Sequence, residues 1–197
     1  MSERLTEILA AACRVIVRDG AARLRMSDVA REAGVSSALV HYYVATRAEL
    51  LARAFAYADA RADAGVQAEL DAGRSALEQL DTLLRFYVGD SPFVRENAVL
   101  WREMWVNAMH DDAQRDRLAE LYAGWIAQVA GLVAAAQEEG AVDRGIGADG
   151  AARRLAALVD GLGAQIAVRM IDGRSASALV RDGIARELGV DRPGVGA

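Results

Sequence analysis

Residues 26–50, MSDVAREAGVSSALVHYYVATRAEL, constrain the fold more than any other segment of the chain. Their composition predicts a short helix that ends at Ala33, because Gly34 then provides the left-handed residue with which helices commonly end. Ser36 is a good N-cap for a second short helix directly afterwards. Two short helices joined by a glycine-centred turn form a helix-turn-helix.

The second helix, starting at about Ser37, is predicted to turn Val40 inward and to present most of its other side chains outward. These outward residues are Ser37, Ala38, Leu39, His41 and Tyr42. A third helix is predicted from about Arg47, since Thr46 and Glu49 have the spacing of a capping box. Its positive N-terminus beside the Arg47 guanidinium would attract phosphate.

This segment resembles the N-terminal domain of the TetR family of bacterial one-component transcriptional regulators. The resemblance is carried by Asp28-Val29-Ala30, Ala33-Gly34-Val35-Ser36, Val40-His41-Tyr42-Tyr43 and Thr46-Arg47-x-x-Leu50. It implies base contacts from Ser37, Ala38, Leu39 and Tyr42, and DNA-backbone contacts from His41, Tyr43 and Arg47. With Ser36, these residues form the predicted DNA-binding set. Three positions depart from the family pattern: Arg25 replaces a Thr cap, Val44 a Phe, and Arg47 a Lys.

The composition predicts an all-α, cytoplasmic protein. Of its 197 residues 53% are hydrophobic, only two are proline, and no run of alternating β-branched residues is present. The lone Cys13 excludes an intrachain disulfide framework and fits a reducing compartment. The N-terminal sequence is charged, and the apolar stretch 125–136 is shorter than the ~20 residues of a membrane span. We therefore expect no membrane association.

The charge is divided unevenly along the chain. Residues 1–53 hold eight Arg and six acidic residues, a net charge of +2, although the whole chain carries −5. The remainder holds fifteen Arg and twenty-two acidic residues, a net charge of −7. This asymmetry indicates two parts with different partners.

About nine helices are predicted, in an N-terminal three-helix helix-turn-helix domain (1–50), a C-terminal helical ligand-binding and dimerisation domain (51–190) and a flexible tail (191–197). The first helix spans about 3–18. After the two short helices of the helix-turn-helix, one helix starts after Ser75, and the others span about 47–70, 93–109, 113–139, 151–171 and 176–188. Ser75 with Glu78 predicts a capping box, and Ser91 with Pro92 predicts another helix start.

Two late helices carry long apolar stripes that could pack within one chain or between two chains. The segment 100–169 resembles the C-terminal domain of the BetI-like subgroup of the same family. Its marks are Leu100-Trp101-x-x-Met104-Trp105, Leu121-Tyr122-x-x-Trp125 and Leu158-x-Asp160-Gly161-Leu162. The resemblance implies a homodimer held by a four-helix bundle. The predicted interface comprises Leu121, Trp125, Val129, Leu155, Leu158, Val159, Leu162 and Ile166.

Aromatic and methionine side chains are concentrated between positions 86 and 125. The predicted ligand-binding set is Phe86, Trp101, Met104, Trp105, Asn107, Met109, Tyr122, Trp125 and Gln165, with Tyr87, Phe93 and His110 as further candidates. For each of these residues, ordinary core packing is the alternative. Aromatic rings would suit an apolar or a cationic effector.

The resemblance implies a repressor that binds a palindromic DNA operator as a dimer and is released by a small-molecule effector. The alternative is a helical ligand-binding or adaptor protein of the same fold that does not bind DNA. We expect no enzyme activity, cofactor or metal, because the chain holds only two histidines, His41 and His110, and no nucleophile or phosphate-loop motif.

Overall fold

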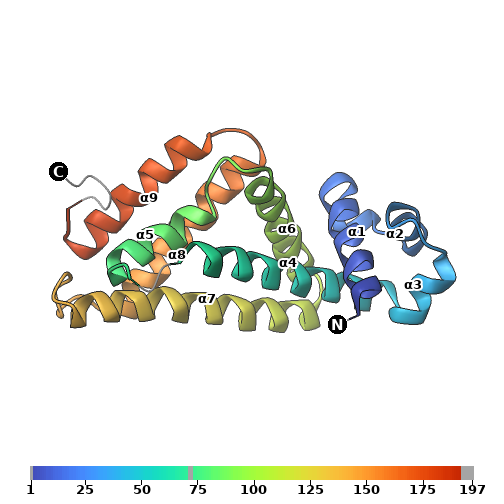
Figure 1. Cartoon of the computed structure of the whole chain (residues 1–197), viewed down its shortest axis with the longest axis horizontal. Coiled ribbons are helices and arrows are strands. Elements are labelled where there is room, and N and C mark those ends of the chain that lie inside the picture. The colour runs from blue at the N-terminus through green and yellow to red at the C-terminus, as the bar shows by residue number, and fades with distance from the viewer. Residues whose placement is uncertain (1, 71–72, 192–197) are drawn as a thin grey trace. The chain divides into compact units, whose positions relative to one another are not determined.

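The computed structural model describes residues 2–70 and 73–191, which form nine α-helices and one short 3₁₀ helix (Figure 1). In chain order they are α1 (Glu3–Asp19), η1 (Ala21–Arg23), α2 (Met26–Glu32), α3 (Ser37–Tyr43), α4 (Arg47–Glu69), α5 (Ala76–Phe86), α6 (Pro92–Ala108), α7 (Asp112–Glu138), α8 (Ala148–Ala167) and α9 (Gly173–Leu188). The predicted all-α class is confirmed. Most of the predicted flexible tail, residues 192–197, lies outside the described residues.

The described chain divides into two compact units. The first contains the residues up to 64 together with 99–118, and the second contains 65–98 and the residues from 119 onward. The helices α4, α6 and α7 each contribute residues to both units. The unit that contains the helix-turn-helix therefore extends beyond the predicted boundary at residue 50. Helix-capping signals mark where a helix begins, and they carry no information about where its packing partners change.

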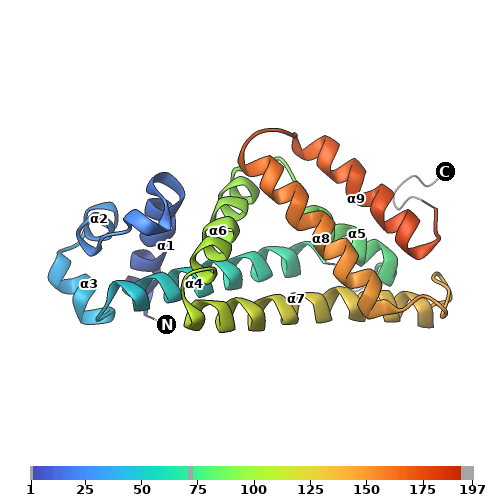
Figure 2. The ribbon, with the colours of Figure 1, turned by 180° about the vertical axis from the view of Figure 1, so that it is seen from behind.

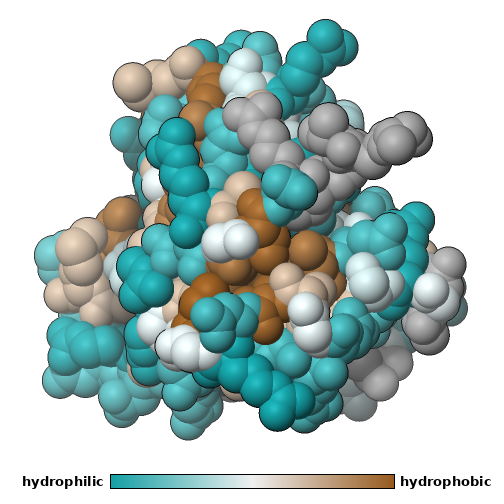
Figure 3. Space-filling model, turned by 90° about the vertical axis from the view of Figure 1, so that its left-hand side faces the viewer, coloured by the Kyte–Doolittle hydropathy of each residue, from teal (hydrophilic) through white to brown (hydrophobic). Residues whose placement is uncertain are grey.

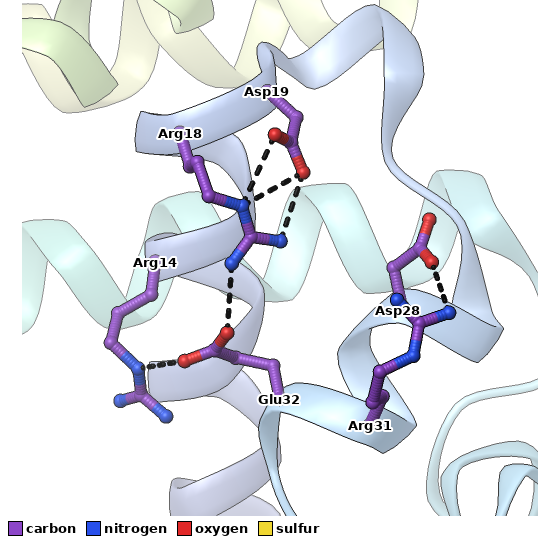
Figure 4. Close-up of polar contacts among 6 residues, drawn as sticks. All are labelled: Arg14, Arg18, Asp19, Asp28, Arg31 and Glu32. Carbon is purple, nitrogen blue, oxygen red and sulfur yellow. Dashed lines mark hydrogen bonds and ion pairs between the residues drawn. The ribbon is translucent and has the colours of Figure 1, made fainter.

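In the first unit, α1 packs against α2, and α2 packs against α3. Fully buried side chains such as Ile8, Ile16 and Phe55 fill its core. On its surface, the Glu32 carboxylate lies 2.7 Å from Arg14 Nε and 2.9 Å from Arg18 Nη1 (Figure 4). Hydrogen bonds from these arginines hold the pKa of Glu32 below its usual range. The C-terminal end of α2 is thereby tied to α1.

The second unit is built around α5, α8 and α9, which pack against one another (Figure 2). One buried carboxylate joins two of these helices: Asp81 on α5 lies 2.7 Å from Arg85 Nη2 and 3.4 Å from Arg181 Nε of α9. A buried charge without such partners would be strongly destabilising.

Helix α7 is, among the described residues, the helix long and apolar enough to cross a membrane by length and composition alone. The prediction from the stretch 125–136 did not anticipate this, because it left out the uncharged residues 121–124, Leu-Tyr-Ala-Gly, which extend the apolar segment. In the second unit α7 contributes Val129, Val133 and Ala136 to the core, and a core helix meets the same criterion.

The N-terminus of α9 approaches the α5–α6 connection closely. The Gly173 N–H donates to Asp90 Oδ1 at 2.6 Å, and a Cβ at Gly173 would lie 2.5 Å from the backbone carbon of Gly89. Gly173→Ala is therefore expected to lower the melting temperature by several degrees, since overpacking against backbone costs about 1–3 kcal/mol. Calorimetry of the two proteins measures this difference.

Gly163→Ala is the matched control, because a Cβ at this position of α8 would meet no atom within 4 Å. That variant is expected to melt at or above the wild-type temperature, since alanine is the better helix former. Wild-type stability of Gly173→Ala would show that this contact does not constrain the fold.

Candidate functional site

The turn between α2 and α3 has the predicted backbone geometry. Gly34 has φ +67°, and the Val35 N–H returns to the Ala30 carbonyl at 2.9 Å. This 6→1 bond is the mark of a Schellman motif, in which glycine avoids the strain of a left-handed residue. Val35, between the turn and the N-cap of α3, is half-buried. Arg25 caps α2 without a side-chain hydrogen bond, so no group replaces the family's Thr cap.

Helix α3 is anchored at one side and exposed at the other. The Ser36 hydroxyl accepts the Leu39 N–H at 3.2 Å, which confirms the predicted N-cap, and Val40 is fully buried. Ser36, Ser37, Ala38, His41 and Tyr42 are exposed, whereas Leu39 and Tyr43 are half-buried.

Among the large hydrophobic side chains of the helix-turn-helix, Tyr42 is the most exposed, at 79%. Its ring meets the edge of Tyr43 with the centroids 5.1 Å apart. The fold therefore presents short polar residues and one aromatic ring on the same helix. Such a surface is suited to contacts in a DNA groove, where side chains reach base edges.

The start of α4 differs in detail from the prediction. The Thr46 hydroxyl accepts the Glu49 N–H at 3.1 Å, but the Glu49 carboxylate accepts the N–H of Ala45 rather than that of Thr46. The Arg47 guanidinium donates to the Leu24 carbonyl at 2.9 Å from Nε. Arg47 is thus engaged with backbone of its own unit, and its contact with a DNA phosphate stays a prediction.

The second unit holds a continuous series of aromatic contacts, which we call the aromatic cluster. Its ring centroids are 5.8 Å apart for Phe86 and Phe93, 5.5 Å for Phe86 and Tyr87, 5.7 Å for Tyr87 and Trp125, and 5.9 Å for Tyr122 and Trp125. All five side chains are half-buried. The buried Nε1 of Trp125 has no hydrogen-bond partner. The fold brings together five of the aromatic residues that were candidates for ligand binding.

A carboxylate that sequence reasoning missed adjoins this cluster. Asp160 on α8 accepts the Tyr122 hydroxyl at 2.6 Å. Burial raises the pKa of Asp160, and the bond from Tyr122 only partly opposes that shift. Burial and this bond also raise the pKa of Tyr122 above its usual range. Asp160 interrupts the apolar pattern of α8, which was the available signal for a special role.

Most of the remaining predicted ligand residues belong to the first unit. These are Trp101, Met104, Trp105, Asn107 and Met109. Met104 is buried, whereas Trp105 and Met109 are 41% and 63% exposed. The Asn107 side chain donates to the Glu103 carbonyl at 2.7 Å. Gln165 and His110 are exposed.

Most of the predicted dimer-interface residues are packed within the single chain, and the interface itself stays a prediction. Val129, Leu155, Val159, Leu162 and Ile166 are buried in the core of the second unit. Leu121, Trp125 and Leu158 remain half-exposed. A stripe of apolar residues looks the same in a sequence whether another helix of the same chain or a second chain covers it, and here intrachain packing accounts for most of it.

Two family matches cover most of the chain. Residues 8–54 match the bacterial regulatory proteins of the tetR family, and residues 76–189 match the C-terminal domain described as a BetI-type transcriptional repressor. Among known relatives, the HTH-type transcriptional regulator BetI of Agrobacterium fabrum is 32% identical over 121 residues, which span 60% of this chain and 57% of that protein. The BetI of Brucella suis is 27% identical over 187 residues, 94% of this chain and 91% of the relative.

Solved structures with the same fold include two with comparable sequence identity. One is a TetR-family regulator from Rhodococcus sp., with 33% identity, a TM-score of 0.86, and coverage of 95% of this chain and 100% of that one. The other is a transcriptional regulator from Saccharomonospora viridis in complex with choline, with 30% identity, a TM-score of 0.84, and coverage of 93% and 96%. These relatives are described as regulators of transcription and not as enzymes.

Proposed function

Since this chain belongs to the TetR family of transcriptional regulators and has a BetI-type C-terminal domain, we propose that it is a repressor that binds a palindromic operator as a dimer and leaves it when a small organic cation binds. The protein would act in the bacterial cytoplasm, where its operator lies. The single observation that carries the DNA-binding part is the surface of α3. On it, five of the predicted DNA-binding residues are exposed: Ser36, Ser37, Ala38, His41 and Tyr42. The alternative of an adaptor that has lost DNA binding is disfavoured for the same reason.

Operator binding by this helix requires a second copy of the chain. One short recognition helix buries little surface, whereas two helices about 34–36 Å apart contact successive major grooves. Three helix-interior glycines support close approach of a partner: Gly124, Gly131 and Gly161 are exposed, and a Cβ at any of them would meet no atom within 4 Å. A glycine in a helix interior lowers the stability of the helix by about 1 kcal/mol relative to alanine, and the close approach of another backbone would offset this loss.

The surface of the molecule offers room for this partner. On the side where α9 and the end of α7 lie, hydrophobic side chains gather at the centre of a hydrophilic rim (Figure 3). Separately from that patch, Val168 and Met170 at the α8–α9 connection and Leu179 on α9 are large exposed apolar side chains of the second unit, at 55%, 76% and 45% exposure. Apolar patches with polar rims are typical of protein interfaces.

The effector class follows from the chemistry around Asp160. This half-buried carboxylate has the Tyr122 hydroxyl as its hydrogen-bond partner, and desolvation raises its pKa. Desolvation of that kind favours the approach of a cation, because a cation would offset the buried charge. Aromatic rings attract quaternary ammonium groups, and Asp160 is bonded to Tyr122, whose ring centroid lies 5.9 Å from that of Trp125. The choline bound by the Saccharomonospora relative belongs to this class.

The experiment measures the affinity of the purified protein for its upstream intergenic DNA at several salt concentrations, with and without choline. We expect affinity to fall steeply, by roughly 10³-fold or more between 50 and 200 mM salt, because phosphate contacts release counterions. Choline should weaken binding, whereas its uncharged carbon isostere, 3,3-dimethylbutanol, should not. A flat salt response would contradict operator binding, and equal effects of both compounds would contradict a cationic effector.

A further inference from the structure

The connection between α1 and α2 is held by a residue from a distant part of the chain. The N–H of Ala21, the first residue of η1, donates to Oε2 of Glu103 on α6 at 2.6 Å, across 82 sequence positions. Ala21 is fully buried, and Gly20 before it turns the chain with φ +83°. A charged acceptor on a partly buried N–H makes a stronger hydrogen bond than a neutral one.

The carbonyls of this connection are held from α4. The Nη2 atom of Arg47 donates to the carbonyls of Ala21 and Ala22 at 2.5 and 3.2 Å, in addition to the Nε bond to Leu24. A carboxylate therefore accepts the first N–H of η1, and a guanidinium donates to the carbonyls of its first two residues and of Leu24 directly after it. The connection directly before the helix-turn-helix is thus fastened to α6 through an N–H and to α4 through its carbonyls.

We propose that Glu103 is a positioning residue for DNA recognition, which holds the α1–α2 connection, and through it α2 and α3, to α6. Helix α6 is continuous from Pro92 to Ala108 and carries Phe93 of the aromatic cluster near its start. A shift of α6 would therefore act on Ala21 through Glu103. Besides its positioning role, Glu103 would thus couple effector binding to operator affinity, and this coupling rests on the proposed function.

Hydrogen exchange of the α1–α2 connection tests the positioning role without DNA or effector. In Glu103→Ala, the amide of Ala21 loses its acceptor, and its exchange is expected to become at least about tenfold faster. Glu103→Gln retains an acceptor oxygen and is expected to restore most of the protection. Glu96→Gln, which removes an exposed carboxylate from the same helix, should exchange as the wild type does. Equal exchange at Ala21 in wild type and Glu103→Ala would overturn the proposal.

The coupling is measured as the factor by which saturating choline changes operator affinity. In Glu103→Ala this factor is expected to approach one, while the choline affinity of the free protein stays within about twofold of wild type. A general loss of stability would not shift this ratio. Wild-type coupling in Glu103→Ala would overturn the inference and leave the proposed repressor intact. Failure of the wild-type protein itself to bind DNA would instead refute the proposed function, and the exchange experiment would still decide the positioning role.

Discussion

Replacement of Tyr42 by alanine is expected to lower operator affinity at least about tenfold without changing the melting temperature. The side chain is 79% exposed, and its ring contact is with the adjacent Tyr43, so the fold loses little when it is removed. Side-chain contacts to bases contribute about 1–3 kcal/mol each, and a dimer makes each contact twice. Gel retardation measures the affinity, and thermal unfolding measures the stability.

Met109→Ala is a matched control for this experiment. Its side chain is 63% exposed and belongs to the same compact unit, but it lies outside the helix-turn-helix. It should bind the operator as the wild type does, and size-exclusion chromatography should show the same oligomer for all three proteins. Wild-type affinity of Tyr42→Ala would contradict the assignment of α3 as the recognition helix.

Replacement of Asp160 by asparagine is expected to abolish the response to choline while stabilising the protein. Asparagine can still accept the Tyr122 hydroxyl, but it removes the charge that would attract the cation. Burial raises the pKa of Asp160, so the ionised carboxylate destabilises the folded state at neutral pH. We therefore expect a higher melting temperature together with choline affinity reduced at least about tenfold. Tryptophan fluorescence titration and calorimetry measure the two effects.

The raised pKa of Asp160 makes both the stability of the fold and the choline affinity depend on pH. The pKa of Asp160 is higher in the folded state than in the unfolded state, so the folded state binds the proton more tightly. The free energy of unfolding therefore rises as the pH falls through the raised pKa toward the ordinary value of an aspartate. Choline affinity should decline over that same interval, since protonation removes the charge. Asp149→Asn, the same substitution at an exposed position of α8, should leave choline binding unchanged. Retained choline affinity in Asp160→Asn would contradict this site.

The helix-turn-helix could be predicted from the sequence because its determinants are local. Gly34 and Ser36 act on backbone groups within a few residues, and the structure has both the left-handed turn and the N-cap. The capping box at Ser75 and the first helical position of Pro92 were predicted for the same reason and are confirmed. The 3₁₀ helix of residues 21–23 was not predicted, because its groups are held by Arg47 and Glu103 from elsewhere in the chain.

The sequence by itself determined the helical class, the order of the helices and the exposed face of α3, since capping and periodicity act over one or two turns. The tertiary structure alone decided which aromatic residues meet, that Asp160 adjoins them, and that Glu103 holds Ala21 across 82 positions. It also decided that Leu155 and Ile166 fill the interior of one chain. Contacts between distant segments depend on how the helices pack, and a helical stripe has the same pattern whichever surface covers it.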